Sequence, residues 1–258
     1  MLVNPFYTIL TVSWFVTATV TFVSLFYVSA PYGRHSRQGW GPGIQARFGW
    51  LIMESASPLF FCLFLFRSGG LPGGAASNPV VLLFAGLWLL HYANRAFIYP
   101  FRMKGGTRPM ALTVVLMAFS FNVVNGYLNG TWLRRHAVAY GPGWLSDPRL
   151  LAGAVLFISG FLINIHSDGI LRRLRNKDGG GYKIPRGGLF TLVTGANYFG
   201  EILEWFGWAC LTWSTAGLAF AFWAACNLIP RARTHHRWYI ENFPDYPKDR
   251  KAIIPFLF

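Results

Sequence analysis

Long apolar stretches separated by short polar segments dominate the chain from end to end. The first, residues 4–28, contains no charged side chain and is long enough for a membrane-spanning helix, which needs about 20 mostly apolar residues. It lacks a basic start and a small-residue cleavage site, so we interpret it as a retained span rather than a signal peptide. Further stretches follow at 48–66, 79–99, 109–133, 150–170, 189–212 and 215–232. The pattern predicts an all-α, multi-pass membrane protein with seven transmembrane helices.

Basic residues gather in alternate loops of this arrangement. The chain has 23 Lys and Arg against 9 Asp and Glu, a formal net charge of +14. With the C-terminus in the cytoplasm, 18 basic residues fall on the cytoplasmic side and 4 on the far side, while Arg95 lies within a span. Because basic residues are retained in cytoplasmic loops, the N-terminus is expected outside and the C-terminus in the cytoplasm. The membrane is the cytoplasmic membrane if the source is bacterial and the endoplasmic reticulum membrane if it is eukaryotic.

The composition excludes several other classes of protein. Hydrophobic residues make up 53% and charged residues 12%, about half the share of roughly 25% usual in soluble domains. So few charges on so apolar a chain favour a bilayer over nucleic acid as the partner. Three widely spaced cysteines make a disulfide framework or a zinc site unexpected. The glycine clusters form neither a GxGxxG motif nor a P-loop between a strand and a helix, so we expect one transmembrane domain over 1–258 rather than a Rossmann domain.

Polar side chains inside two early spans are the first candidates for function, because charge at membrane depth is costly. Glu54 lies in the second span, where a lone carboxylate must find a partner or stay protonated. Tyr92, Arg95 and Tyr99 share one face of the third span at i, i+3 and i+7. The alternatives are an inert Glu54 near the membrane interface and an aromatic belt that includes Tyr99.

A polar stripe emerges from the fifth span. Asn164, Asp168, Arg172 and Arg175 recur at i, i+4, i+8 and i+11 on one helical face. Guanidinium groups bind phosphate in a bidentate manner, and amide and carboxylate groups bind sugar hydroxyls. The stripe therefore suits a nucleotide, although an Asp–Arg helix pair combined with positive-inside charge would also explain it.

Two carboxylates lie one turn apart in the sixth span. Asn197, Glu201 and Glu204 share a face at i, i+4 and i+7, an arrangement that packing alone does not explain. No HExxH or ExxH spacing accompanies them, so no metal is expected.

The last span continues into a basic segment. Arg231, His235 and either Trp238 or Tyr239 follow helical spacing beyond the membrane. A basic amphipathic helix lying on anionic lipid is the alternative explanation. Together with the two earlier groups, this segment places anion-binding residues at the cytoplasmic ends of several spans. That arrangement indicates an enzyme whose phosphorylated cofactor enters from the cytoplasm and whose apolar substrate enters from lipid.

At these residues the sequence resembles the steroid 5α-reductase family. The resemblance is densest from about 150 to the C-terminus and includes HY at 91–92 and the context of Glu54. It implies a seven-helix oxidoreductase that uses NADPH to reduce the carbon–carbon double bond of a 3-oxo-Δ4 steroid. The strings that carry it are INIHSD (163–168), ILRRLR (170–175), GYKIPRGGLF (181–190), GANYFGEILEW (195–205) and DYPKDRKAIIPF (245–256).

The resemblance also assigns roles to residues. Glu54 and Tyr92 match positions that recognise the substrate carbonyl. Met53 and Gly169 depart from residues common in the family, which leaves the cofactor positions intact and the steroid preference open. More distant relatives reduce polyprenols, enoyl-CoA or sterol rings. Cofactor-binding elements concentrate in 160–258, and the matched positions are Arg108, Asn164, Asp168, Arg172, Arg175, Tyr182, Lys183, Asn197, Glu201, Arg231, His235 and Tyr239.

The implied reaction delivers hydride to the β-carbon of an enone and builds negative charge on the carbonyl oxygen. Tyr92 can donate its phenol proton to that oxygen, whereas Glu54 can donate only if protonated. NADPH is preferred over NADH if Arg172, Arg175, Lys183 or Arg231 binds the 2′-phosphate.

Two other classes of protein stay open at this point. An isoprenylcysteine-type membrane methyltransferase would also bind its cofactor at the ends of the last helices. A non-enzymatic lipid or proton transporter would use Glu54, Glu201 and Glu204 as proton carriers and would bind no nucleotide tightly. We expect a monomer.

Overall fold

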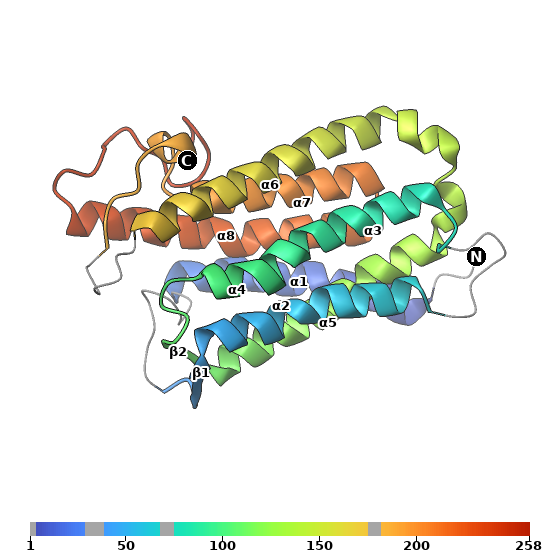
Figure 1. Ribbon diagram of the computed structural model, residues 1–258, viewed down its shortest axis with the longest axis horizontal. Helices are drawn as coiled ribbons and strands as arrows, with labels where there is room; N and C mark the ends of the chain where they lie inside the picture. The colour runs from blue at the N-terminus through green and yellow to red at the C-terminus, as the bar shows by residue number, and fades with distance from the viewer. Residues whose placement is uncertain (1–3, 29–38, 68–74, 175–181) are drawn as a thin grey trace. The chain divides into compact units, whose positions relative to one another are not determined.

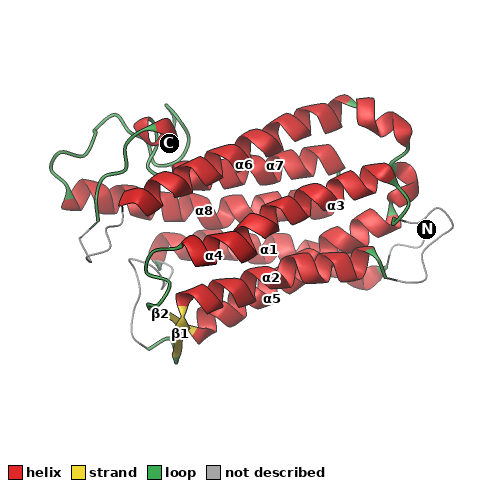
Figure 2. Ribbon diagram, viewed as in Figure 1, coloured by secondary structure: helices red, strands yellow, loops and turns green. Residues whose placement is uncertain are grey.

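The structure is a computed structural model and describes residues 4–28, 39–67, 75–174 and 182–258. Helices make up nearly all of this part of the chain, and the only strands drawn in it lie together (Figure 2). The elements are α1 (Pro5–Tyr27), β1 (Gly43–Gln45), α2 (Ala46–Leu65), α3 (Pro79–Tyr92), the π-helix η2 (Ala93–Ile98), α4 (Tyr99–Arg102), β2 (Pro109–Ala111), α5 (Leu112–Arg135), the 3₁₀ turns η3 (Ala137–Ala139) and η4 (Pro142–Ser146), α6 (Pro148–Leu174), the 3₁₀ turn η5 (Gly188–Thr191), α7 (Ala196–Thr212) and α8 (Thr215–Asn242).

The contacts divide the chain into two compact units. One comprises Met1–Ala30 and Ala152–Phe258, and the other comprises Pro31–Leu151. We call them the terminal unit and the middle unit. The single domain expected over 1–258 stays a prediction.

A two-stranded sheet, β1 with β2, lies at the start of two long helices of the middle unit, and we call it the strand clasp. Strands β1 and β2 pair antiparallel, with Gly43 opposite Ala111, and each lies directly ahead of a long helix. Helices α2 and α5 then run side by side in the same direction (Figure 1). Gly126 on α5 allows the close approach, because a Cβ there would lie 2.8 Å from the Ser57 carbonyl oxygen on α2. A second glycine, Gly130, meets the Phe61 backbone one turn further along.

Between these helices the chain runs through α3, η2 and α4. Asn78 caps α3, because its side-chain oxygen accepts the N–H groups of Val80 and Val81. The π-helical turn η2 ends shortly before Pro100, which has no N–H to give to the Ala96 carbonyl as an α-helix would require. The wider turn brings Arg95 onto the side of this segment that contacts α2.

The terminal unit is built on close helix contacts. Helices α6 and α7 run antiparallel and touch at glycines: Gly153 lies against Leu211, Gly160 against Glu204, and Gly200 against Asn164. At each of these glycines a Cβ would collide with backbone atoms of the neighbouring helix, so larger residues would force the helices apart. These contacts place residues 164–168 of α6 beside the start of α7.

Helix α8 follows α7 after a tight turn in which Trp213 is left-handed, with φ 45°, and Ser214 caps the new helix. Helix α1 packs on α8 through aromatic pairs, such as Trp14 with Trp223 at 5.6 Å between ring centroids. The segment after α8 returns to the start of α7, where Thr194 N–H donates to the Lys251 carbonyl at 2.8 Å.

The helical, membrane-type fold agrees with the sequence prediction. Five helical segments of the described chain are long and apolar enough to cross a membrane: α1, α2, the segment 79–102, α5 and α6. The sixth predicted span, 189–212, is helical throughout only from 196, because η5 and a backbone bridge occupy its start. The span predicted from 109 begins as strand β2, and that predicted to end at 232 continues as helix to Asn242.

Candidate active site

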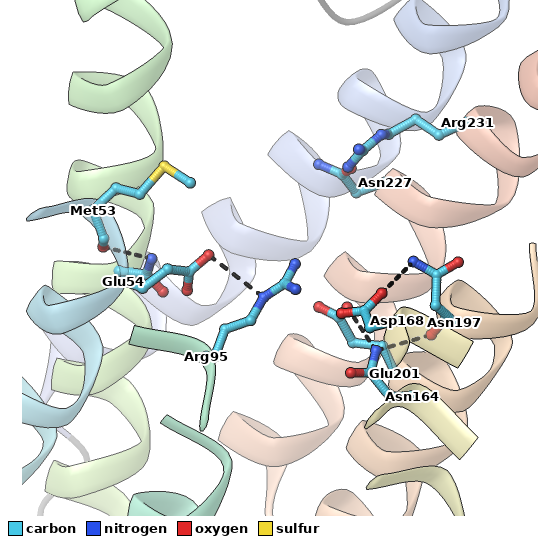
Figure 3. A network of polar contacts seen from close by, with 10 residues as sticks. Met53, Glu54, Arg95, Asn164, Asp168, Asn197, Glu201, Asn227 and Arg231 are labelled. Carbon is cyan, nitrogen blue, oxygen red and sulfur yellow. Dashed lines mark hydrogen bonds and ion pairs between the residues drawn. The ribbon is translucent and has the colours of Figure 1, made fainter. Parts of the chain in front are cut away.

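An ion pair lies among aromatic rings in the middle unit. Arg95 Nε lies 3.9 Å from Glu54 Oε1, and the two side chains are only 15% and 14% exposed (Figure 3). The Arg95 guanidinium also lies over the Trp50 ring at 4.5 Å and the Tyr99 ring at 5.1 Å. Cation–π contacts and the carboxylate therefore fix the cation together.

Tyr92 is the last residue of α3 and lies one turn ahead of Arg95. It is 2% exposed and packs against Trp88, with 5.3 Å between ring centroids. On α2, Asn122 of α5 donates through Nδ2 to the Met53 carbonyl at 2.8 Å, which holds the backbone next to Glu54. The middle unit thus fixes the helix segments that carry Glu54 and Tyr92, the two residues expected to bind a substrate carbonyl.

Four predicted cofactor residues meet in the terminal unit, between α6 and α7. Asn164 Nδ2 donates to the Asn197 carbonyl at 3.0 Å and to Glu201 Oε2 at 3.4 Å. Asn197 Nδ2 in turn donates to Asp168 Oδ1 at 3.2 Å (Figure 3). Asn164 and Asp168 are buried, at 3% and 6% exposure. We call these four residues the amide–carboxylate cluster.

Other residues of the same two helices differ in their surroundings. Arg172 is half-buried one turn beyond Asp168, as the predicted stripe requires. Glu204 is fully buried, and its backbone faces Gly160 of α6. Arg175, the last member of the predicted stripe, lies outside the described residues.

Two more predicted residues meet on α8 through a tyrosine of α7. Arg231 Nη2 donates to the Tyr198 hydroxyl at 3.0 Å, and that hydroxyl lies 3.2 Å from His235 Nε2. Arg231 Nη1 also donates to Asn227 Oδ1 at 3.2 Å.

The predicted residues Tyr182, Lys183 and Tyr239 form a third group in the terminal unit. The buried Tyr239 donates its hydroxyl to the Lys183 carbonyl at 3.3 Å, while the Lys183 side chain is exposed. Tyr182 packs edge-on against Trp238 at 5.2 Å between centroids. The contacts hold the start of the described segment 182–190 against α8.

A buried network fastens the C-terminal segment to the start of α7. Thr194 Oγ1 lies 2.7 Å from His236 Nδ1, 2.6 Å from the Tyr246 hydroxyl and 3.2 Å from the Lys251 carbonyl. Arg250 donates to the Tyr246 hydroxyl at 3.4 Å. Burial, together with the positive charges of Arg250 and Lys251, lowers the pKa of His236 below its ordinary value of 6.5. We call these residues the Thr194 network.

Arg108 is set apart from the other predicted cofactor residues. It lies in the middle unit, exposed on a turn where its N–H donates to the Gly105 carbonyl at 3.0 Å. The remaining cofactor positions that the structure describes all lie in the terminal unit. Across the described ranges, no group of three or more His, Cys, Asp or Glu could hold a metal ion.

Sequence reasoning missed two partners in these sites. It placed Arg95 beside Tyr92 but did not pair it with Glu54. The sequence did contain evidence for this pair, because a carboxylate inside an apolar span needs a partner and Arg95 is the basic residue that lies within a span. It also passed over Tyr198, which lies next to Asn197 in sequence but on a different face of α7, and nothing in its local pattern marks it.

The fold and the sites together define a helical, apolar protein of membrane type with polar clusters in the terminal unit and a partly buried ion pair in the middle unit. The sequence profile of the family described as 3-oxo-5-alpha-steroid 4-dehydrogenase matches residues 108–258. The chain is 45% identical to "Steroid 5-alpha-reductase DET2" of Gossypium hirsutum, over 95% of this chain and 94% of that protein. It is 48% identical to "3-oxo-5-alpha-steroid 4-dehydrogenase 1" of Homo sapiens, over 88% of this chain and 86% of that protein.

A third relative, "3-oxo-5-alpha-steroid 4-dehydrogenase 1" of Bos taurus, is 46% identical over 92% of this chain and 91% of that protein. The chain therefore belongs to the 3-oxo-5-alpha-steroid 4-dehydrogenase family. It is an oxidoreductase of the class that acts on CH–CH groups, and the family uses a nicotinamide cofactor.

Proposed function

We propose that the protein reduces the carbon–carbon double bond of a 3-oxo-Δ4 steroid, or of a similar lipid enone, with NADPH as the hydride donor. The observation that carries this proposal is the amide–carboxylate cluster, which joins Asn164, Asp168, Asn197 and Glu201 through hydrogen bonds on two helices. The relatives named as 3-oxo-5-alpha-steroid 4-dehydrogenases support the substrate class.

The donor and acceptor groups of the terminal unit fit a nicotinamide dinucleotide. Carboxylates of Asp168 and Glu201 accept hydrogen bonds from ribose hydroxyls, and neighbouring amides can bind the carboxamide. Arg172, Arg231 and the more exposed Lys183 supply cations for phosphates. When bound, NADPH supplies a hydride. The protein's part is to hold the dinucleotide in one orientation by these contacts.

The middle unit supplies the groups for the substrate carbonyl. Tyr92 donates its phenol proton to the oxygen, whose negative charge grows as the β-carbon is reduced. Glu54 can donate to that oxygen only when it is protonated, whereas its ion pair with Arg95 belongs to the ionised form and fixes the cation one turn beyond Tyr92, so the two roles alternate with the protonation of the carboxyl. The α-carbon takes its proton from water.

Seven spans remain the best reading of the topology. Helix α7 has 17 residues, about 25 Å at 1.5 Å per residue. It lies antiparallel to α6, a helix that is apolar enough to cross the bilayer. Pairing with α6 supports α7 as a sixth span, and the tight turn into α8 supports a seventh. With an N-terminus outside, Lys183 and the C-terminal segment are then cytoplasmic.

The decisive experiment uses the purified chain, NADPH and a 3-oxo-Δ4 steroid. Loss of nicotinamide absorbance that depends on the steroid, with one mole of 5α-reduced steroid formed per mole of NADPH, is the expected result. The Glu54→Ala variant is the matched control for background oxidation. Tight NADPH binding without any reduced steroid would overturn the substrate assignment. Binding of an S-adenosyl donor in place of NADPH would instead support a methyltransferase.

A further inference from the structure

Tyr198 links α7 to α8 through its side chain, and it is not one of the positions matched to the family. Its hydroxyl accepts a hydrogen bond from Arg231 Nη2 at 3.0 Å and lies 3.2 Å from His235 Nε2. The guanidinium also lies 5.0 Å from the centre of the Tyr198 ring. Asn227, one turn earlier on α8, holds Arg231 Nη1 at 3.2 Å (Figure 3).

The chemistry of these groups gives the contacts a single direction. A guanidinium has donors only, so the Tyr198 oxygen must accept from Arg231. The phenol keeps its own proton and can donate it to His235 Nε2, which lies 3.2 Å away. A neutral imidazole that accepts at Nε2 carries its proton on Nδ1. The bond from Arg231 to Tyr198 restrains the guanidinium, and donation from Tyr198 to His235 would select the Nδ1–H tautomer of the imidazole.

We propose that Tyr198 is a positioning residue for the cofactor: its hydroxyl holds Arg231 toward a phosphate of NADPH and holds His235 as an Nδ1–H donor. The proposal rests on the proposed function, since Arg231 and His235 are cofactor residues only if the chain binds NADPH. Arg side chains carry much rotamer entropy, so a cation that is already restrained loses less freedom when a phosphate binds.

The test is to remove the hydroxyl and keep the ring. Tyr198→Phe retains the packing and the aromatic face under Arg231, and deletes only the hydrogen bonds. Dissociation constants of NADPH and NADH are measured on the purified full-length chain by quenching of tryptophan fluorescence. We expect NADPH affinity to fall about 10-fold, the scale of one hydrogen bond to a charged group, with kcat at saturating NADPH little changed.

A comparison of NADPH with NADH shows whether Arg231 binds the 2′-phosphate or the pyrophosphate. If Arg231 binds the 2′-phosphate, NADH affinity stays constant in Tyr198→Phe; if it binds the pyrophosphate, both affinities fall together. The matched control is Tyr140→Phe, which loses a hydroxyl that accepts from Trp132 Nε1 at 3.1 Å in the middle unit. It should bind NADPH as the wild type does.

A double-mutant cycle distinguishes positioning from general stability. In an Arg231→Ala background, Tyr198→Phe should cost clearly less than in the wild type, because only the contact of Tyr198 with His235 is left to lose. Asn227→Leu removes the other restraint on Arg231 and should also weaken NADPH binding. Normal binding in both Tyr198→Phe and Asn227→Leu would overturn the inference, as would an equal loss in the two backgrounds. A wild type that binds no NADPH would sink the proposed function itself, and the inference with it. A wild type that binds, but is unaffected by Arg231→Ala, would sink only the inference.

Discussion

The middle and terminal units handle polar groups inside a membrane protein in opposite ways. In the middle unit, the charges at the proposed substrate site are the partly buried pair of Glu54 and Arg95, and the rings of Trp50 and Tyr99 lie against the guanidinium. In the terminal unit, amides, carboxylates, hydroxyls and cations are joined in clusters that run from α6 through α7 to α8. The proposed function accounts for the difference, since an apolar enone offers one polar atom and a dinucleotide offers many.

The largest expected effect is a loss of steroid turnover, without loss of cofactor affinity, in variants of the middle unit. Glu54→Ala and Tyr92→Phe each remove a contact to the growing oxyanion and should lower turnover by roughly 100-fold or more. Glu54→Gln keeps a donor and should retain part of the activity. NADPH affinity should survive all three changes, because the predicted cofactor residues other than Arg108 lie in the terminal unit. Measuring affinity and steroid turnover on the same preparations checks this, and a parallel loss of both would show that these residues are structural instead.

The converse effect, weaker NADPH binding with turnover retained, is expected for substitutions in the terminal unit. Arg172→Ala should weaken NADPH binding by about 2 kcal/mol, the scale for a charge-assisted hydrogen bond. Arg175→Ala should act in the same way. Turnover at saturating NADPH should remain, in contrast to the Glu54 variants. Cofactor titrations monitored by fluorescence provide the measurement. An unchanged dissociation constant in both arginine variants would leave the phosphates to Lys183 or Arg231.

A packing variant asks whether the terminal unit depends on contact between its helices. Gly160→Val places a side chain against the Glu204 backbone and should destabilise the protein by about 1–3 kcal/mol. The control is Gly86→Val on α3, where a Cβ would have nothing within 4 Å. Thermal unfolding of the two variants side by side gives the answer, and equal midpoints would contradict the close packing of α6 on α7.

The smallest effect is a pH dependence of the Thr194 network. Because the pKa of folded His236 lies below the unfolded value of about 6.5, the unfolded state binds the proton more readily. The stability is complete above pH 6.5 and declines as the pH falls from there toward the lowered folded pKa. The protection factors of the Thr194 and Gly195 amides, which donate to the C-terminal segment, should therefore fall under mild acid when hydrogen-exchange rates are corrected for the pH dependence of intrinsic exchange.

His236→Asn keeps a side-chain acceptor for Thr194 and cannot be protonated in this range. It should remove the acid-dependent fall in the protection factors. Were this variant to show the same acid response as the wild type, His236 would not be the group that titrates.

The success of sequence reasoning also differs between the two units. Helical spacing placed Asn164 and Asp168 on one face and Asn197 and Glu201 on another, and the packing of α6 on α7 then brings the two faces together. The pairing of Glu54 with Arg95 could not be predicted from spacing alone, because it depends on which helices are in contact. It also depends on a π-helical turn, which the hydrophobic periodicity does not indicate. The strand at 109–111 was hidden for a related reason, because its apolar residues continue the pattern of the helix that follows.

The strand clasp of the middle unit also has a consequence for how the protein enters the membrane. Strands β1 and β2 precede α2 and α5, and the two helices lie side by side in the same direction. If both helices span the bilayer, the chain between them must cross it an odd number of times, and the segment 79–102 is long and apolar enough to provide one such crossing. If that segment failed to insert, β2 would be left on the opposite side of the membrane from β1. The six-residue sheet can therefore form only when the number of membrane crossings between the two strands is odd. A chain inserted with the wrong number of crossings could not pair β1 with β2.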